Sequence, residues 1–169
     1  HAGAGGVGLA ALQIARSRGA RLFATAGSEE KRAYLARLGV EAVGSSRDTS
    51  FVDTIREATG GEGIDVVLSS LPGREMIEAS LDLLRPFGCY VDIGKRDIVE
   101  NTEIGMRVLH KSLSLHTVDM ELLFASAPEK AGRILRDVMA AVETGDLAPL
   151  PFERFEMSDP GAAFQKMAG

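Results

Sequence analysis

The chain has 169 residues, which is the length of a single domain. With 19 basic and 24 acidic side chains its net charge is −5, which argues against nucleic acid or an anionic membrane surface as a partner. Hydrophobic residues make up 45% of the sequence, but no apolar run approaches the ~20 residues of a membrane span, so we expect a globular domain and no membrane.

A glycine-rich segment, His-Ala-Gly-Ala-Gly-Gly-Val-Gly, occupies residues 1–8. Its Gly-x-Gly-x-x-Gly spacing is typical of a loop that binds a dinucleotide pyrophosphate. One glycine permits a tight turn, a second keeps the backbone open to the phosphates, and the third lets the next helix pack closely. The expected cofactor-binding residues of this loop are Gly3, Gly5, Gly6, Val7 and Gly8.

A helix is predicted over Val7–Arg18, with Gly19 where a C-terminal cap belongs. Its first N–H groups and its dipole would point at the bound anion. A phosphate loop of this kind normally follows a strand, and no residue precedes His1 in this sequence. We therefore expect the first strand of the fold to be truncated.

Short apolar runs alternate with helical patterns along the rest of the chain. Strands are predicted at 21–26, 40–43, 64–68, 89–93 and 113–118, and helices at 28–38, 50–59, 74–84 and 131–145. The strands at 21–26 and 64–68 are expected to be buried. Ser28 is the predicted N-cap of one helix, and Ser50 with Asp53 is a pair like a capping box at the start of another. This alternation predicts an α/β fold, a doubly wound parallel sheet of the Rossmann type.

The end of the second strand of such a fold distinguishes NAD from NADP. An Asp or Glu there binds the ribose 2′-OH of NAD, but this chain has Ala-Gly-Ser at 26–28, and the nearest acid, Glu29, already belongs to the next helix. Lys31 and Arg32 lie one turn on, and Ser-Ser-Arg follows at 45–47. Hydroxyl and cationic groups favour binding of a 2′-phosphate, and hence of NADP. The alternative is that Lys31 and Arg32 only form a solvated helix face and bind no phosphate.

A Pro-rich segment, Ala-Pro-Leu-Pro at 148–151, breaks the alternation. We assign residues 1–147 to an NADP-binding Rossmann domain. Residues 148–169 are the expected start of a return segment into a substrate-binding domain that is otherwise absent. Within this segment a strand is predicted at 152–156, followed by a helix capped by Ser158.

Five segments carry a resemblance to a known family. They are residues 1–8, Ala-Thr-Ala-Gly-Ser at 24–28, Ser-Ser-Arg at 45–47, Val-Val-Leu-Ser-Ser-Leu-Pro-Gly at 66–73 and Asp-Ile-Gly-Lys-Arg-Asp-Ile at 92–98. On these segments the chain resembles, almost end to end, the nucleotide-binding half of the enoyl reductase domains of type I polyketide and fatty acid synthases. Those domains belong to the zinc-independent branch of the medium-chain dehydrogenase/reductase superfamily.

The resemblance implies that NADPH reduces an α,β-unsaturated thioester held on an acyl carrier protein, with hydride going to Cβ and a proton to Cα. It places the family's lysine at Lys95. The acidic partner of that lysine is Asp119 by the polyketide synthase pattern, which we favour, or Glu121 by the animal fatty acid synthase pattern. Both residues are therefore candidates, and the predicted catalytic residues are Lys95 and Asp119.

Further cofactor contacts follow from the same resemblance. Ser28, Lys31 and Arg47 match positions that are used for the 2′-phosphate. The predicted cofactor contacts after the strands at 64–68 and 89–93 are Ser70, Leu71 and Gly94. Ser69 departs from the family, which usually has asparagine there.

Two other functions stay open: a stand-alone NADPH quinone oxidoreductase-like enzyme, and a dinucleotide-binding module without catalysis. The Ile-Gly-Lys-Arg-Asp-Ile segment argues against the first, and Lys95 with Asp119 against the second. Neighbouring synthase domains are expected partners, a homodimer is left open, and residues 1–169 alone should reduce a thioester weakly or not at all.

The metal and redox expectations rest on Cys89, the single cysteine. One cysteine permits no intrachain disulfide and no cysteine zinc cluster. Because His110 and His116 share no ligand spacing with Cys89 or a carboxylate, no metal site is predicted. A reducing cytoplasm is the simplest compartment.

Overall fold

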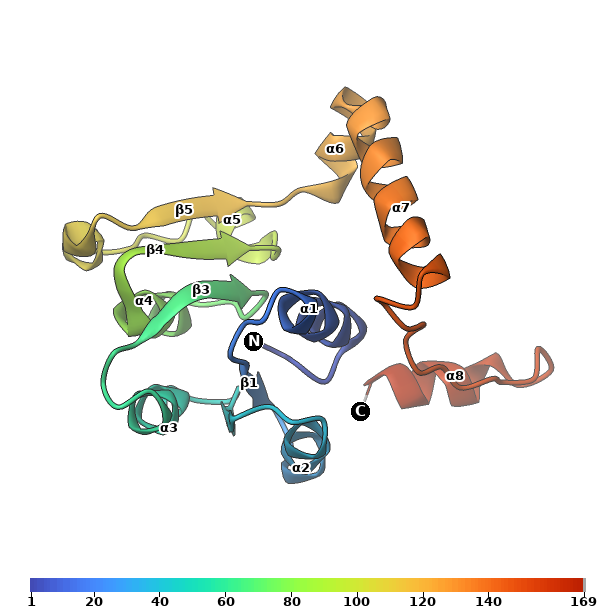
Figure 1. Cartoon of the computed structure of the whole chain (residues 1–169), viewed down its shortest axis with the longest axis horizontal. Coiled ribbons are helices and arrows are strands. Elements are labelled where there is room, and N and C mark those ends of the chain that lie inside the picture. Colours follow the sequence, from blue (N-terminus) through green and yellow to red (C-terminus); the bar gives the residue numbers. More distant parts are fainter. Residues whose placement is uncertain (169) are drawn as a thin grey trace.

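The computed structural model describes residues 1–168 of the chain (Figure 1). In this part, β1 (Phe23–Ala26) pairs with β2 (Ala42–Ser45), and β3 (Ile64–Ser69) pairs with β4 (Leu84–Asp92), which in turn pairs with β5 (Ser114–Thr117). All three pairings are parallel. The predicted parallel α/β fold of the Rossmann type is confirmed, but the strands form two sheets, β2-β1 and β3-β4-β5, rather than one.

Helices cover both faces of the strands, and the last two helices of the described chain stand to the side of them (Figure 1). The helices are α1 (Gly6–Ser17), α2 (Glu29–Arg37), α3 (Phe51–Ala58), α4 (Arg74–Leu83), α5 (Arg96–Val99), the 3₁₀ helix η1 (Met106–Lys111), α6 (Met120–Ser126), α7 (Pro128–Glu143) and α8 (Pro160–Ala168). Leu12 of α1 and Leu35 of α2 pack with Ala24 on one face, whereas Phe51 of α3 packs with Leu83 of α4 on the other. One pair of helices on one face and the next pair on the other is the arrangement of a doubly wound fold.

A slot separates the two sheets. It is an apolar cavity of about 700 Å³ lined by β1 and β3 and by side chains of α1, so that the unpaired edges of β1 and β3 both border it. The strand order is therefore that of the standard six-stranded Rossmann sheet with the position of its first strand open. The predicted burial of 64–68 is consequently wrong in part, because Val66 is 61% exposed.

Residues 1–3 enter one end of this slot. The α-amino group of His1 donates to the Leu68 carbonyl at 2.7 Å, and the Gly3 N–H donates to the Thr25 carbonyl at 2.9 Å. The chain thus hydrogen-bonds to β3 on one side and to β1 on the other, as a central parallel strand does.

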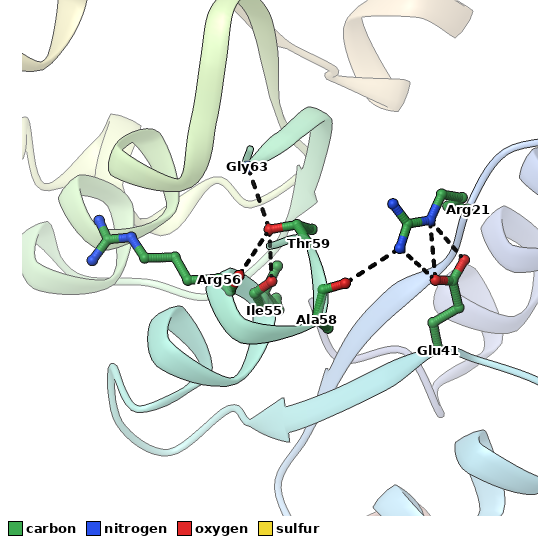
Figure 2. Close-up of polar contacts among 7 residues, drawn as sticks. All are labelled: Arg21, Glu41, Ile55, Arg56, Ala58, Thr59 and Gly63. Carbon is green, nitrogen blue, oxygen red and sulfur yellow. Dashed lines mark hydrogen bonds and ion pairs between the residues drawn. The ribbon is translucent and has the colours of Figure 1, made fainter. Parts of the chain in front are cut away.

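Arg21 and Thr59 line the slot near the starts of β1 and β3. Figure 2 shows the polar contacts that they make. The Arg21 guanidinium donates to both carboxylate oxygens of Glu41, at 2.8–3.1 Å, and to the Ala58 carbonyl at 3.3 Å. The Thr59 hydroxyl donates to the Ile55 carbonyl at 2.9 Å and accepts the N–H of Gly63 at 3.3 Å. These contacts join β1, β2, the end of α3 and the turn into β3.

The helix starts show which local predictions hold. Ser28 caps α2 as predicted, with its hydroxyl accepting the N–H of Lys31 at 3.3 Å. The Ser50–Asp53 capping pair is wrong, because Ser50 already has helical dihedrals and makes no side-chain cap. Asp48 accepts the N–H of Ser50 at 2.9 Å instead, two residues earlier.

The C-terminal segment also differs from expectation. Residues 152–156 form no strand, since no described strand lies beside them to complete their hydrogen bonds. α8 is capped by Asp159, which accepts the N–H of Ala162 at 3.2 Å, and not by Ser158. None of the helices within residues 1–168 is long and apolar enough to cross a membrane.

Candidate functional site

The glycine loop lies beside the end of β1 and leads into α1. Gly8 sits directly on the loop backbone, since a Cβ at this position would lie 2.6 Å from the carbonyl oxygens of Ala2 and Gly3. Gly5 is more open, and the single neighbour of a Cβ there would be the Ala2 carbonyl at 3.4 Å. Close packing is thus required at Gly8. The N–H of Gly5 donates to the Ala2 carbonyl at 3.0 Å, so the first N–H groups of α1 are the donors that an anion would use.

We expect Gly8→Ala to lower the free energy of unfolding by about 1–3 kcal/mol, because the added methyl group must push the helix from the loop. Urea unfolding without nucleotide measures the change. Gly6→Ala is the matched control on the same helix turn, since its added Cβ would meet only Leu150, at 3.9 Å. Equal stability of the Gly8→Ala and Gly6→Ala variants would contradict the close packing.

The residues predicted for the 2′-phosphate gather around the turn at 26–28 that follows β1. The Arg47 guanidinium lies over Gly27, where a Cβ would be 2.9 Å from its Nε atom. Ser28 and Lys31 belong to the first turn of α2 and its cap. Arg32 lies outside the predicted set, and its guanidinium donates to the Ala26 carbonyl at 3.3 Å. Three cationic residues therefore border a turn that carries no carboxylate.

The loops after β3 and β4 contact each other at the carboxyl ends of these strands. The Ser69 carbonyl accepts the N–H of Ile93 at 2.9 Å, and its hydroxyl accepts the N–H of Leu71 at 3.2 Å. A Cβ at Gly94 would lie 3.7 Å from the Ser70 carbonyl. The structure thus brings Ser70, Leu71 and Gly94 together, and it shows that serine at position 69 folds the loop through its hydroxyl group.

Lys95 forms an ion cluster with both candidate acids. Its Nζ atom lies 2.9 Å from Glu121 Oε2 and 3.1 Å from Asp119 Oδ1. Hydrogen bonds with Glu121, and then with Asp119, raise the pKa of Lys95 above its ordinary value. Lys95 is half exposed, so it is an accessible cation throughout the neutral pH range.

The two acids are held differently. Asp119 is the N-cap of α6 and accepts the N–H of Leu122 at 3.1 Å. This bond, followed by that with Lys95, lowers the pKa of Asp119. Glu121 has an 86% exposed side chain and no such backbone bond. Asp119 is therefore the better fixed of the two partners, although both touch Lys95.

The histidines and the cysteine lie outside this cluster. The ring of His1 bonds with the hydroxyl groups of Thr25 and Ser80, at 3.0 and 2.8 Å, which is a structural arrangement. His110 bonds with the Arg107 carbonyl at 2.8 Å. In residues 1–168 no group of three or more His, Cys, Asp or Glu side chains is arranged to hold a metal ion.

A family model described as zinc-binding dehydrogenase matches residues 6–130. A phenolphthiocerol/phthiocerol polyketide synthase of Mycobacterium tuberculosis is 42% identical over 168 residues, which are 99% of this chain and 8% of that protein. The chain thus spans under a tenth of the length of this curated relative.

Two solved structures have folds similar to that of this chain. The nucleotide-binding subdomain of the enoylreductase domain of PpsC from Mycobacterium tuberculosis superposes with a TM-score of 0.82 at 43% identity, covering 89% of this chain and 83% of that one. Escherichia coli quinone oxidoreductase complexed with NADPH gives 0.71 at 28% identity, covering 90% of this chain and 46% of that one.

Proposed function

The chain belongs to the zinc-binding dehydrogenase family and, within it, to the nucleotide-binding subdomains of polyketide synthase enoyl reductases, and from this we propose that it binds NADPH for the reduction of an enoyl thioester. The observation that carries the proposal is the Lys95 cluster at the end of β4, beside the loop that follows β3. Ligands of parallel α/β sheets bind at this edge.

The residues present fit a phosphorylated dinucleotide. Gly5 leaves the loop backbone open, and the start of α1 offers N–H groups to the pyrophosphate. Arg47, Ser28 and Lys31 would hold the 2′-phosphate, with Arg32 as an addition from the structure. Ser70, Leu71 and Gly94 would border the nicotinamide end.

NADPH, when bound, supplies the hydride that goes to Cβ of the substrate. Lys95 offers a positive charge to the thioester oxygen, where negative charge develops, or a proton to Cα. Asp119 and Glu121 favour the charged form of Lys95 and hold its ammonium group at the strand end. Lys95 thus acts as the electrostatic or the proton-donating group, and the acids orient it.

The wider assignment extends the same proposal. The substrate would be an enoyl group on an acyl carrier protein, and neighbouring synthase domains would complete the site. Residues 1–147 would form the cofactor domain, and residues 148–169 would lead out of it. The cytoplasm would be the compartment. Homodimer formation stays a candidate. The quinone oxidoreductase alternative is disfavoured by its lower identity and TM-score.

The cofactor assignment predicts that the chain binds NADPH more tightly than NADH. Arg47→Ala should weaken NADPH binding by about 1–3 kcal/mol, the value of a charge-assisted hydrogen bond, and leave NADH binding unchanged. Nucleotide fluorescence titration measures both affinities. Arg37→Ala removes the same charge from the far end of α2 and serves as the control. Equal affinities for the two nucleotides in the unchanged chain would refute the 2′-phosphate site.

A further inference from the structure

The carboxylate of Asp97 joins the two loops that border the candidate site. Both of its oxygens accept the N–H of Gly73, each at 3.1 Å, although 24 residues separate the two positions. Its Oδ1 atom also accepts the hydroxyl of Thr102 at 2.8 Å, and the Thr102 N–H donates to the Asp97 carbonyl at 2.9 Å. One side chain thus connects the segment after β4 to the loop after β3.

The bond to Gly73 closes the β3 loop at its far end. At its near end the loop is held by the Ser69 carbonyl, which accepts the N–H of Ile93. Gly73 has a φ of +105°, a conformation that side chains rarely adopt, and it precedes α4. Ser70 and Leu71 therefore lie between two anchors, and both anchors belong to the segment that carries Lys95.

The segment itself has little intrinsic stability. α5 contains four residues, which is too few for a helix to hold its shape alone, and Lys95 is its N-cap. The carboxylate at the other end of this helix, that of the C-cap Glu100, pairs at 2.9 Å with Arg96 of the same helix. Asp97 is half-buried and reaches across to another element, which Glu100 does not do.

We propose that Asp97 is a positioning residue that fixes the distance between Lys95 and the cofactor-binding loop at Ser70 and Leu71. This role rests on the proposed function, because it requires that Lys95 act on a substrate beside the bound nicotinamide. A carboxylate two residues beyond Lys95 holds the loop opposite, so Lys95 and the loop keep one spacing. Misplacement of a reacting group by about 1 Å can slow an enzyme about 100-fold.

The test uses a complete enoyl reductase that carries this nucleotide-binding half. Asp97→Ala should lower kcat about 10–100-fold at saturating NADPH, with a melting temperature that shows the domain to be folded. Asp97→Asn should recover most of the rate, since its amide oxygen still accepts the Gly73 N–H. Glu100→Gln is the matched control, because the Glu100 carboxylate lies at the end of the same helix and pairs with Arg96 rather than with the β3 loop. The kcat of this variant should stay within about twofold of that of the unchanged enzyme.

A double-mutant comparison identifies the route of the effect. If Asp97 acts by placing Lys95, then Asp97→Ala should slow a Lys95→Ala enzyme little further. Full multiplication of the two effects would overturn the proposal, as would a kcat for Asp97→Ala equal to that of Glu100→Gln. Should Asp97→Ala not fold, Asp97→Leu repeats the test with the side-chain volume kept and no acceptor for the Gly73 N–H. A kcat equal to that of Glu100→Gln would again overturn the proposal. An unchanged kcat for Lys95→Ala alone is a different result, which refutes the proposed function itself.

Discussion

Lys95→Ala is expected to lower kcat of a complete enoyl reductase by about 10²–10⁴-fold while NADPH binding stays nearly intact. The variant removes the accessible cation at the end of β4 but leaves the glycine loop in place, and it also leaves Arg47 beside the turn at 26–28. Steady-state kinetics with a crotonyl thioester and titration with NADPH measure the two quantities. A drop much smaller than tenfold would show that another group or water protonates Cα.

The partners of Lys95 can be separated in the same assay. Asp119→Asn should slow turnover more than Glu121→Gln does, because Asp119 is fixed by its helix cap whereas the Glu121 side chain is exposed. The double variant of Lys95 and Asp119 should be less than multiplicative if the two act as a unit. Slow turnover of Glu121→Gln together with normal turnover of Asp119→Asn would reverse the assignment.

A strand of five apolar β-branched residues joined to His1 is expected to raise the melting temperature of the chain by about 5–10 °C. The strand would occupy the slot and pair with β1 and β3. Each buried side chain contributes about 1.5–3 kcal/mol against an ordering cost of about 1.5 kcal/mol per residue, which leaves a few kcal/mol. For a chain of this size 1 kcal/mol corresponds to about 2–4 °C.

The pH dependence of stability tests the burial of the His1 amino group, since any residue joined to His1 converts this amine to a peptide N–H. Burial lowers the pKa of the His1 α-amino group to about 6. Because its value in the unfolded chain is 8.0, the unfolded state binds more protons between pH 6 and 8, and the stability of the unextended chain should rise with pH over this window. The extended chain has a peptide N–H there and should lack this rise.

For the melting temperature, an extension containing two prolines is the control. Equal melting temperatures for the apolar and the proline-containing extensions would contradict strand pairing.

The sequence predicted most elements because their signals are local. Short apolar runs located the strands, and glycines at positive φ, such as Gly19 and Gly39, ended helices where predicted. The Ser50–Asp53 pair and the strand at 152–156 failed for another reason. A capping pattern does not show which residue still has extended backbone, and a strand needs a partner that composition cannot supply.

The candidate site depends on long-range geometry. Lys95 and Asp119 meet because β4 and β5 are parallel neighbours whose carboxyl ends coincide, which family resemblance could suggest but residue spacing could not. The bond between Asp97 and Gly73 left no signal in the sequence. It depends on how two loops approach each other after the sheet has formed.

The direction of the His1 side chain fixes the phase of any strand that fills the slot. Its imidazole ring packs edge-on against Phe51 of α3, 4.8 Å between centroids, and bonds with Ser80 of α4. Since side chains alternate along a strand, the residue joined directly to His1 must point to the opposite face, toward Leu12 of α1, and the one before it toward α3 and α4 again. A sequence shifted by one residue would exchange the two sets and set large side chains against the wrong helices.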